Sequence, residues 1–224
     1  MYKLYSMVAA TALLGVAGAA NAFLIDDFNG GDVSIVAAAA IPPPSNGVPG
    51  NPLTEAYSVA LGGAHTLQID TAARPGSSNT ISGGTWNVGN PSNGGSTGFV
   101  SWSDSAGVDL TDGAINDALE LQINQIDIGT TTLTFTVTDV GGASSMLELT
   151  NQTAGQKVFL FSDFSGTADF TRAATVQLAY ITGNNTDLEI DLIQTRQGVP
   201  LPGTIALLGA GLLGLGVRRR KIGA

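Results

Sequence analysis

The chain has 224 residues, a formal net charge of −9 and no cysteine, so it contains neither a disulfide nor a thiolate metal site. Charged residues make up 12% and aromatic residues 6%, while glycine is abundant at 30 residues, a mixture that favours short strands joined by turns. Between residues 23 and 198, 18 acidic residues stand against 4 basic ones, and this net charge of −14 argues against nucleic-acid binding.

The first 22 residues have the pattern of a signal peptide. Lys3 precedes an apolar run, and Ala20-Asn21-Ala22 supplies the small-x-small pattern of a cleavage site. The apolar run is shorter than the roughly 20 residues that a membrane-spanning helix needs. We therefore expect signal peptidase to cut after Ala22, leaving a mature chain that begins at Phe23. The alternative is an uncleaved N-terminal helix.

Two segments of the body have the composition of loops. Residues 37–52 are rich in Pro and Gly, and residues 73–98 are loop-like with one expected strand near Trp86. Such loops often carry ligand contacts, although both could equally be connections without a role. Between them lies His65, the single histidine, which we expect at the surface or edge of a strand rather than in a catalytic site.

Three aromatic residues are candidates for stacking against a sugar ring: Trp86, Trp102 and Tyr57. Aromatic faces, together with amide and carboxylate side chains, are the groups that hold sugars in proteins. The alternative is that the tryptophans are core residues, since large aromatic side chains supply much of the buried apolar area of a domain.

The stretch "VDLTDGAIND" suggests a structural calcium site formed by Asp109, Asp112 and Asp117. Calcium takes six to eight oxygen ligands, mostly carboxylates and carbonyls, but the order of residues departs from an EF-hand loop. A second acidic set lies near the two ends of the body: Asp26, Asp27, Asp187 and Asp191. The alternative for both sets is turn residues and solvated strand faces.

The second half of the body alternates apolar and polar residues with the period of a strand. The residues expected to point inward are Leu119, Leu121, Ile123, Leu133, Phe135, Val137, Val176, Leu178, Tyr180, Leu188, Ile190 and Leu192. The stretch "KVFLFS" is apolar on both faces and is expected to be a central strand. Because no stretch of the body predicts an amphipathic helix, we expect an all-β, antiparallel, jelly-roll-like sandwich over residues 23–198.

The end of the chain combines three features in a fixed order. Val199-Pro200-Leu201-Pro202 is followed by an uncharged stretch, residues 203–217, and then by Arg218, Arg219, Arg220 and Lys221. As a helix the uncharged stretch would be about 22 Å long, shorter than a hydrocarbon core of roughly 30 Å. The basic tail would stay on the cytoplasmic side, so we expect a short transmembrane helix that holds the body outside.

Residues 199–224 resemble the PEP-CTERM sorting signal of Gram-negative bacteria that make exopolysaccharide. The resemblance implies recognition by exosortase, a membrane cysteine protease that processes the tail near the Pro-containing motif. Leu201 stands where the family usually has Glu. The resemblance further implies export, transient insertion in the inner membrane, and a final place at the cell surface or in the medium.

Catalysis is not favoured, because no G-x-S-x-G elbow occurs and no pair of carboxylates stands out as a glycosidase pair. The expected function is therefore a non-catalytic structural or interaction role at the cell surface or in the extracellular matrix. The alternative is a carbohydrate-binding module for exopolysaccharide, and a glycan hydrolase is the third class. Signal peptidase and exosortase are the expected partners during export.

Overall fold

The structure is a computed structural model that describes residues 22–30, 32–36, 53–56, 61–70, 75–92, 94–127 and 131–197. Ala20, Tyr57, the motif Val199–Pro202, the expected helix 203–217 and the basic tail 218–221 lie outside the described residues. Within the described part of the chain, no helix is long and apolar enough to cross a membrane. The expected domain boundaries stay predictions.

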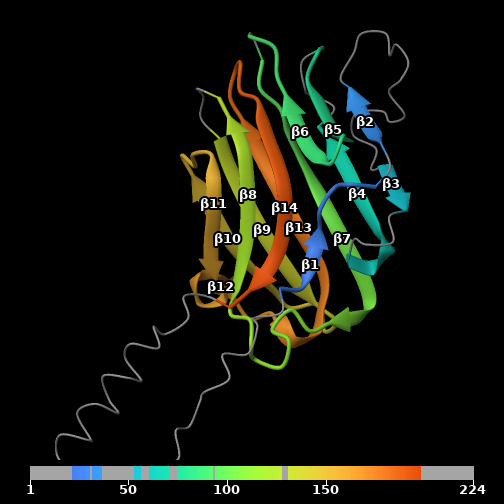
Figure 1. Ribbon diagram of the computed structural model, residues 1–224, viewed down its shortest axis with the longest axis vertical. Helices are drawn as coiled ribbons and strands as arrows, with labels where there is room; N and C mark the ends of the chain where they lie inside the picture. The colour runs from blue at the N-terminus through green and yellow to red at the C-terminus, as the bar shows by residue number, and fades with distance from the viewer. Residues whose placement is uncertain are drawn as a thin grey trace, which may run out of the picture.

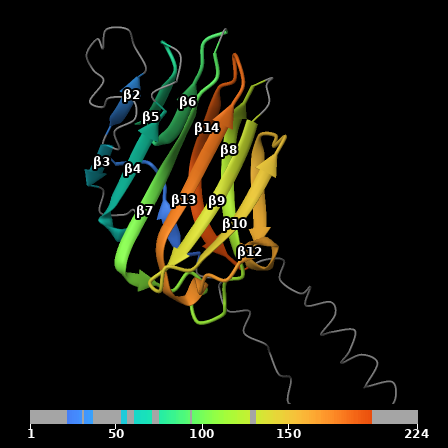
Figure 2. The same cartoon turned by 180° about the vertical axis from the view of Figure 1, so that it is seen from behind.

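The described residues form an all-β sandwich of two antiparallel sheets, which confirms the predicted fold class. Sheet A comprises, in spatial order, β11 (Gly155–Leu160), β8 (Ala118–Ile126), β14 (Leu188–Arg196), β6 (Thr85–Gly89), β5 (Ser78–Ser82) and β2 (Val33–Val36), with β1 (Leu24–Asp26) paired to β14. Sheet B comprises β12 (Ser165–Gly166), β10 (Ser144–Thr150), β9 (Thr131–Asp139), β13 (Ala173–Thr182), β7 (Thr97–Val108), β4 (Ala64–Ile69) and β3 (Leu53–Ala56). Figure 1 looks onto sheet A and Figure 2 onto sheet B.

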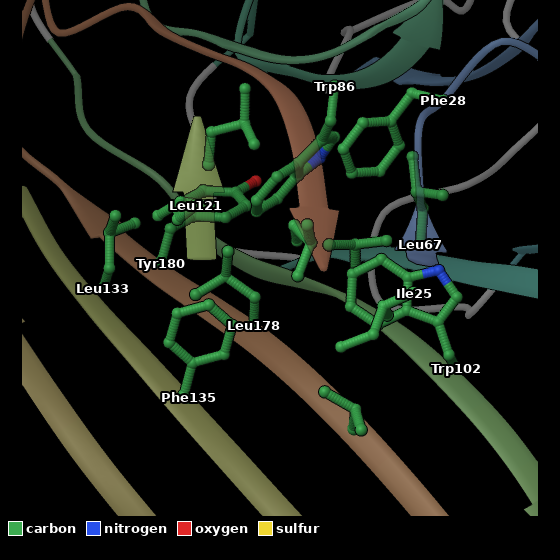
Figure 3. Close-up of a cluster of buried hydrophobic side chains, with 14 of the residues drawn as sticks. Ile25, Phe28, Leu67, Trp86, Trp102, Leu121, Leu133, Phe135, Leu178 and Tyr180 are labelled. Carbon is green, nitrogen blue, oxygen red and sulfur yellow. The ribbon is translucent and has the colours of Figure 1, made fainter. Parts of the chain in front are cut away.

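Alternation of apolar and polar residues forms the core between the sheets. In β9 the even-numbered threonines point outward, while Leu133, Phe135 and Val137 are fully buried, as predicted. The predicted inward residues of β8 and β13 are buried too. Figure 3 shows how side chains from both sheets meet, with Phe135, Leu178 and Tyr180 of sheet B beside Leu121 of sheet A.

The strand predictions were wrong at three places. Leu192 is half-exposed and Ile193 is buried instead, because Asp191 is an extra residue in β14 and shifts the pairing with β8. The stretch "KVFLFS" contributes β11, which is an edge strand of sheet A rather than a central one. Residues 73–98 contain the strand expected near Trp86, which is β6, but they also contain β5, which was not expected and forms a hairpin with β6 in which Ile81 pairs with Trp86.

His65 was also misplaced by the sequence prediction. It lies in β4 and is fully buried, rather than at a surface. Its Nδ1 atom lies 3.0 Å from Oδ2 of Asp26, which is fully buried as well. The same Oδ2 accepts a hydrogen bond from Nε1 of Trp102 at 2.7 Å. The carboxyl group of Asp26, from β1 in sheet A, therefore ties together β4 and β7 of sheet B, and these contacts explain how a polar group is tolerated in the core.

The two ends of the described sandwich come together. The backbone N–H of Phe23 donates to Oγ1 of Thr195 at 3.1 Å, and the N–H of Thr195 donates to the carbonyl of Phe23 at 2.8 Å. Strand β14 runs toward this end, at the bottom of Figure 1. The start of the expected mature chain and the residues that lead to the C-terminal motif thus share one end of the sandwich.

Candidate functional site

The outer face of sheet B is a nearly uncharged surface rich in hydroxyl groups. Antiparallel pairing aligns its outward residues in four rows that cross β7, β13, β9 and β10, with β4 extending two of them. We name this surface the hydroxyl face; its Ser and Thr residues are Thr66, Thr97, Ser101, Ser103, Thr132, Thr134, Thr136, Thr138, Ser144, Thr150 and Thr175. In these four rows, all of them described, Glu148 is the one charged residue. The contrast with a body of net charge −14 is what makes this face distinctive.

An open groove of about 520 Å³ lies on the hydroxyl face, where β7 begins and β13 ends. Phe99 of β7 and Ile181 of β13 supply apolar surface, and Ala179 pairs with Phe99 across the two strands. Ile181 is 57% exposed. The polar lining comes from Gln68, Asp70 and Thr97, and the Thr97 hydroxyl donates to Oδ2 of Asp70 at 3.2 Å.

Phe99 differs from the other phenylalanines of the chain. All eight are described, and the other seven either lie in the core or are half-buried and packed against it. Phe99 is half-buried and points to the outer face. An aromatic ring beside amide, hydroxyl and carboxylate groups is the combination that holds a sugar ring. The groove therefore has the sugar-binding chemistry that the sequence analysis expected at Trp86, Trp102 and Tyr57.

Trp86 is not the sugar-binding surface that was expected, because it is fully buried in the core. Its indole Nε1 donates to Oδ1 of Asn79 at 2.5 Å. The amide of Asn79, in β5 of sheet A, crosses the core and donates to the carbonyl of Gln68 at 2.8 Å and to that of Phe99 at 3.1 Å. Trp86 thus fixes an asparagine that holds the backbone beneath the groove.

Gly98 and Tyr180 complete the floor of the groove. A Cβ atom on Gly98 would collide with the carbonyl of Gln68 and lie 2.6 Å from the Tyr180 phenol oxygen, so only glycine fits there. Burial raises the pKa of the Tyr180 phenol well above its ordinary value. The phenol is therefore neutral and acts in packing.

Trp102 is also buried, with the indole bound to Asp26 rather than open to a ligand. Figure 3 places it beside Ile25, and it shows the ring of Phe28 next to Trp86. The ring centroid of Phe28 lies 6.4 Å from that of Trp86 and 6.3 Å from that of Trp102. Both tryptophans are therefore core residues, which was the alternative to sugar binding, and Tyr57 lies outside the described residues.

The expected calcium residues do not converge on a site. Both oxygens of Asp109 accept hydrogen bonds from its own turn, Oδ1 from Thr111 and Oδ2 from the backbone of Gly113 at 3.0 Å. The Thr111 hydroxyl, followed by these backbone donors, lowers the pKa of Asp109. Asp112 lies in this turn, and Asp117 follows it in the chain. Among the described residues, no three His, Asp or Glu side chains are grouped so that they could hold a metal ion.

A second hollow, of about 290 Å³, lies on the outer face of sheet A. Two carboxylates line it, and both are engaged within the protein. Asn124 Nδ2 donates to Oε1 of Glu189 at 3.0 Å, and the N–H of Asn90 donates to Oδ1 of Asp187 at 3.1 Å. No aromatic residue lines this hollow, so the groove at Phe99 is the better candidate site.

The sequence held one signal that could have found Phe99. In "GFVSWS" the alternation places Phe99 and Ser101 on one face and Val100 and Trp102 on the other. Since Val100 and Trp102 are the buried pair, Phe99 had to point outward. The contributions of Gln68 and Asn79 depend on the pairing of distant strands and had no comparable signal.

Comparison with known proteins identifies one segment of the chain. Residues 198–221 match the family model described as the PEP-CTERM protein-sorting motif, as the sequence pattern predicted. No curated protein matches the chain.

Several solved structures are similar in overall form. The family 11 carbohydrate-binding module of the cellulase Lic26A-Cel5E of Clostridium thermocellum has 14% identity and a TM-score of 0.41, over 80% of this chain and 96% of that one. The family 11 xylanase from Neocallimastix patriciarum has 10% identity and a TM-score of 0.39, over 73% and 98%. The protein titled PfGH50B has 12% identity and a TM-score of 0.41 over 60% of this chain, which spans only 22% of its length. At these TM-scores the likenesses do not bear on what this chain binds.

Proposed function

Because the chain carries a PEP-CTERM protein-sorting motif, we propose that it is an exported protein whose β-sandwich binds an uncharged polysaccharide outside the cell without catalysing a reaction. The motif supports export through the membrane. Exosortase is the proposed partner in sorting, and the cell surface or the surrounding matrix is the proposed destination.

The observation that carries the binding proposal is the groove at Phe99. The half-exposed ring lies beside Ala179 and Ile181 and is bordered by an amide, a hydroxyl and a carboxylate. The apolar faces of sugar rings can pack on the aromatic ring, while the polar groups at the border form hydrogen bonds with the sugar hydroxyls. Phe99 is not among the partly buried apolar residues packed against the core, and with Ala179 and Ile181 it forms a contiguous apolar patch of the kind that marks ligand-binding grooves.

Charge indicates which polysaccharides can bind. The groove has a single carboxylate among its lining residues, Asp70, and no basic side chain. The body around it is strongly acidic, so a polyanionic glycan would be repelled both locally and at a distance. An uncharged glycan meets no such barrier, and Asp70 can accept hydrogen bonds from its hydroxyls.

The absence of catalysis is a proposal that rests on the positions of the acids. Hydrolysis of a glycosidic bond ordinarily needs two carboxyl groups on either side of the bond, about 5 to 9.5 Å apart. Asp70 is the one carboxylate in the lining of the groove, and Asp26 and His65 are buried and in contact with each other. Binding without turnover therefore fits the groove better than hydrolysis.

The position of the groove suits a protein held by its C-terminal segment. Phe23 contacts Thr195 near the end of β14, at the bottom of Figure 1, whereas the groove lies where β7 begins, toward the opposite end of the sandwich. A polysaccharide could therefore reach the groove before and after processing of the sorting motif.

The test uses native affinity electrophoresis of protein purified from cells that express the full chain. Gels contain an uncharged glucan, mannan or galactan, or anionic alginate as a contrast. We expect at least one uncharged polysaccharide to retard the protein, the substitution Phe99→Ala to abolish the retardation, and Val158→Ala to leave it intact. Val158 is the matched control because it is a 41% exposed apolar residue on the opposite sheet. Retardation by alginate alone, or equal retardation of Phe99→Ala and wild type, would overturn the proposal.

A further inference from the structure

From the continuity of the hydroxyl face with the groove, we infer that the occupant is an extended polysaccharide segment that crosses the strands of sheet B, with a far subsite at Thr134 and Glu148. This inference rests on the proposed function and concerns the length and direction of its ligand. The protein would recognise several sugars of an uncharged chain rather than a chain end or a disaccharide.

One row of side chains defines the path. Strand pairing places Gln68 beside Phe99, Phe99 beside Ala179, Ala179 beside Thr134, and Thr134 beside Glu148. The row thus begins in the groove and leads across β13 and β9 to β10. Adjacent strands lie about 4.8 Å apart, so the row from β4 to β10 is about 19 Å long, which exceeds the length of a disaccharide.

Side-chain size keeps this row open in the middle. Ala179 has the smallest side chain of the row, and it lies between Gln177 and Ile181 on the same outward face of β13. These two larger side chains border the row on either side of Ala179. A chain that leaves Phe99 across the strands therefore meets a shallow passage, while a chain running along β13 would have to pass over Gln177 or Ile181.

The polar groups along the row match an uncharged ligand with many hydroxyls. Asp70 near one end and Glu148 at the other are carboxylate acceptors, and the middle of the row is neutral. Glu148 is exposed, and Thr134 is half-exposed. Carboxylates form the stronger hydrogen bonds with sugar hydroxyls, and both would repel a uronic acid. The charge pattern of the row therefore selects the same class of ligand as the groove.

The experiment is titration calorimetry of protein purified from cells that express the full chain, with glucan, mannan and galactan disaccharides, tetrasaccharides and hexasaccharides. We expect affinity to rise from disaccharide to hexasaccharide for the oligosaccharide series that binds. The double substitution Thr134→Val with Glu148→Ala should weaken hexasaccharide binding about tenfold, the loss of one or two hydrogen bonds, and leave disaccharide binding unchanged. The matched control is Thr80→Val, a half-exposed threonine on the outer face of sheet A.

The outcomes separate the two proposals. If none of the oligosaccharides binds and no polysaccharide retards the protein, the proposed function fails and the inference fails with it. If the disaccharide binds as tightly as the hexasaccharide, and the double variant matches wild type, the function stands and the extended path is wrong. A tenfold loss on Gln177→Ala, without one on the double variant, would show a ligand running along β13 and would also overturn the inference.

Discussion

Asn79 is the residue whose replacement tests the internal support of the groove most severely. The substitution Asn79→Ala removes the buried amide that bonds Gln68, Phe99 and Trp86. Each hydrogen bond contributes about 0.5–1.5 kcal/mol to the free energy of unfolding, and the buried N–H of Trp86, left without its acceptor, costs about 1–3 kcal/mol more. For the two bonds donated by Asn79 and the orphaned N–H of Trp86, we therefore expect a loss of about 2–6 kcal/mol, a large part of the roughly 5–15 kcal/mol that keeps a typical domain folded.

The assay is urea unfolding followed by tryptophan fluorescence, because Trp86 reports on the altered site. The matched control is Asn87→Ala in β6, where the half-exposed side chain donates to the carbonyl and the hydroxyl of Thr85 nearby. Because water can replace both bonds at this half-exposed position, we expect this control to change the free energy of unfolding by less than about 1 kcal/mol. A loss below about 1 kcal/mol for Asn79→Ala, or equal losses for the two variants, would refute the role of Asn79 as an inter-sheet tie.

Three further predictions concern other parts of the sandwich. Hydrogen bonds from backbone N–H groups, that of Asp169 first, lower the pKa of Asp139. The contribution of Asp139 to stability is therefore present above the ordinary pKa of an aspartate and is lost as pH falls below about 4. Asp139→Asn should flatten the pH dependence of the urea midpoint in that range, and an unchanged slope would contradict this. Trp102→Phe should cost about 3 kcal/mol in urea unfolding, since it removes a buried hydrogen bond to Asp26, and a loss under 1 kcal/mol would show that the bond is unimportant. Gly98→Ala should destabilise by about 1–3 kcal/mol and weaken polysaccharide retardation, because the added methyl group collides with the Gln68 carbonyl and the Tyr180 phenol. Full stability would contradict the close contact at the floor of the groove.

The fold could be predicted because its signal is local. Alternation in stretches such as "TTLTFTVTD" decides which residues face the core, whichever strands pair later. The same rule failed at Asp191, where one extra residue changes the face of every residue after it, and composition alone does not mark such a bulge. It also failed for β11, because an apolar strand at an edge has the same sequence pattern as a central one.

The candidate site was harder to predict because the candidate residues were chosen by their chemical type, and residue type does not tell whether a side chain faces solvent or the core. Trp86 and Trp102 were chosen for their rings, yet a ring binds a ligand only if it points out of the core, and both are buried. Asp109 was chosen for its charge, but its oxygens accept hydrogen bonds from its own turn. The groove itself joins residues from β4, β7 and β13, and their register is decided by pairings that a single sequence does not display.

The central claim is that an uncharged polysaccharide binds on the outer face of sheet B, and amide chemical-shift mapping by NMR tests it most directly. Isotope-labelled protein purified from cells that express the full chain would be titrated with the hexasaccharide of the binding glycan series. We predict that the largest shifts occur at Gln68, Phe99 and Ile181, with smaller shifts reaching Thr134. Shifts confined to the outer face of sheet A, around Asn87 and Glu189, would contradict the account.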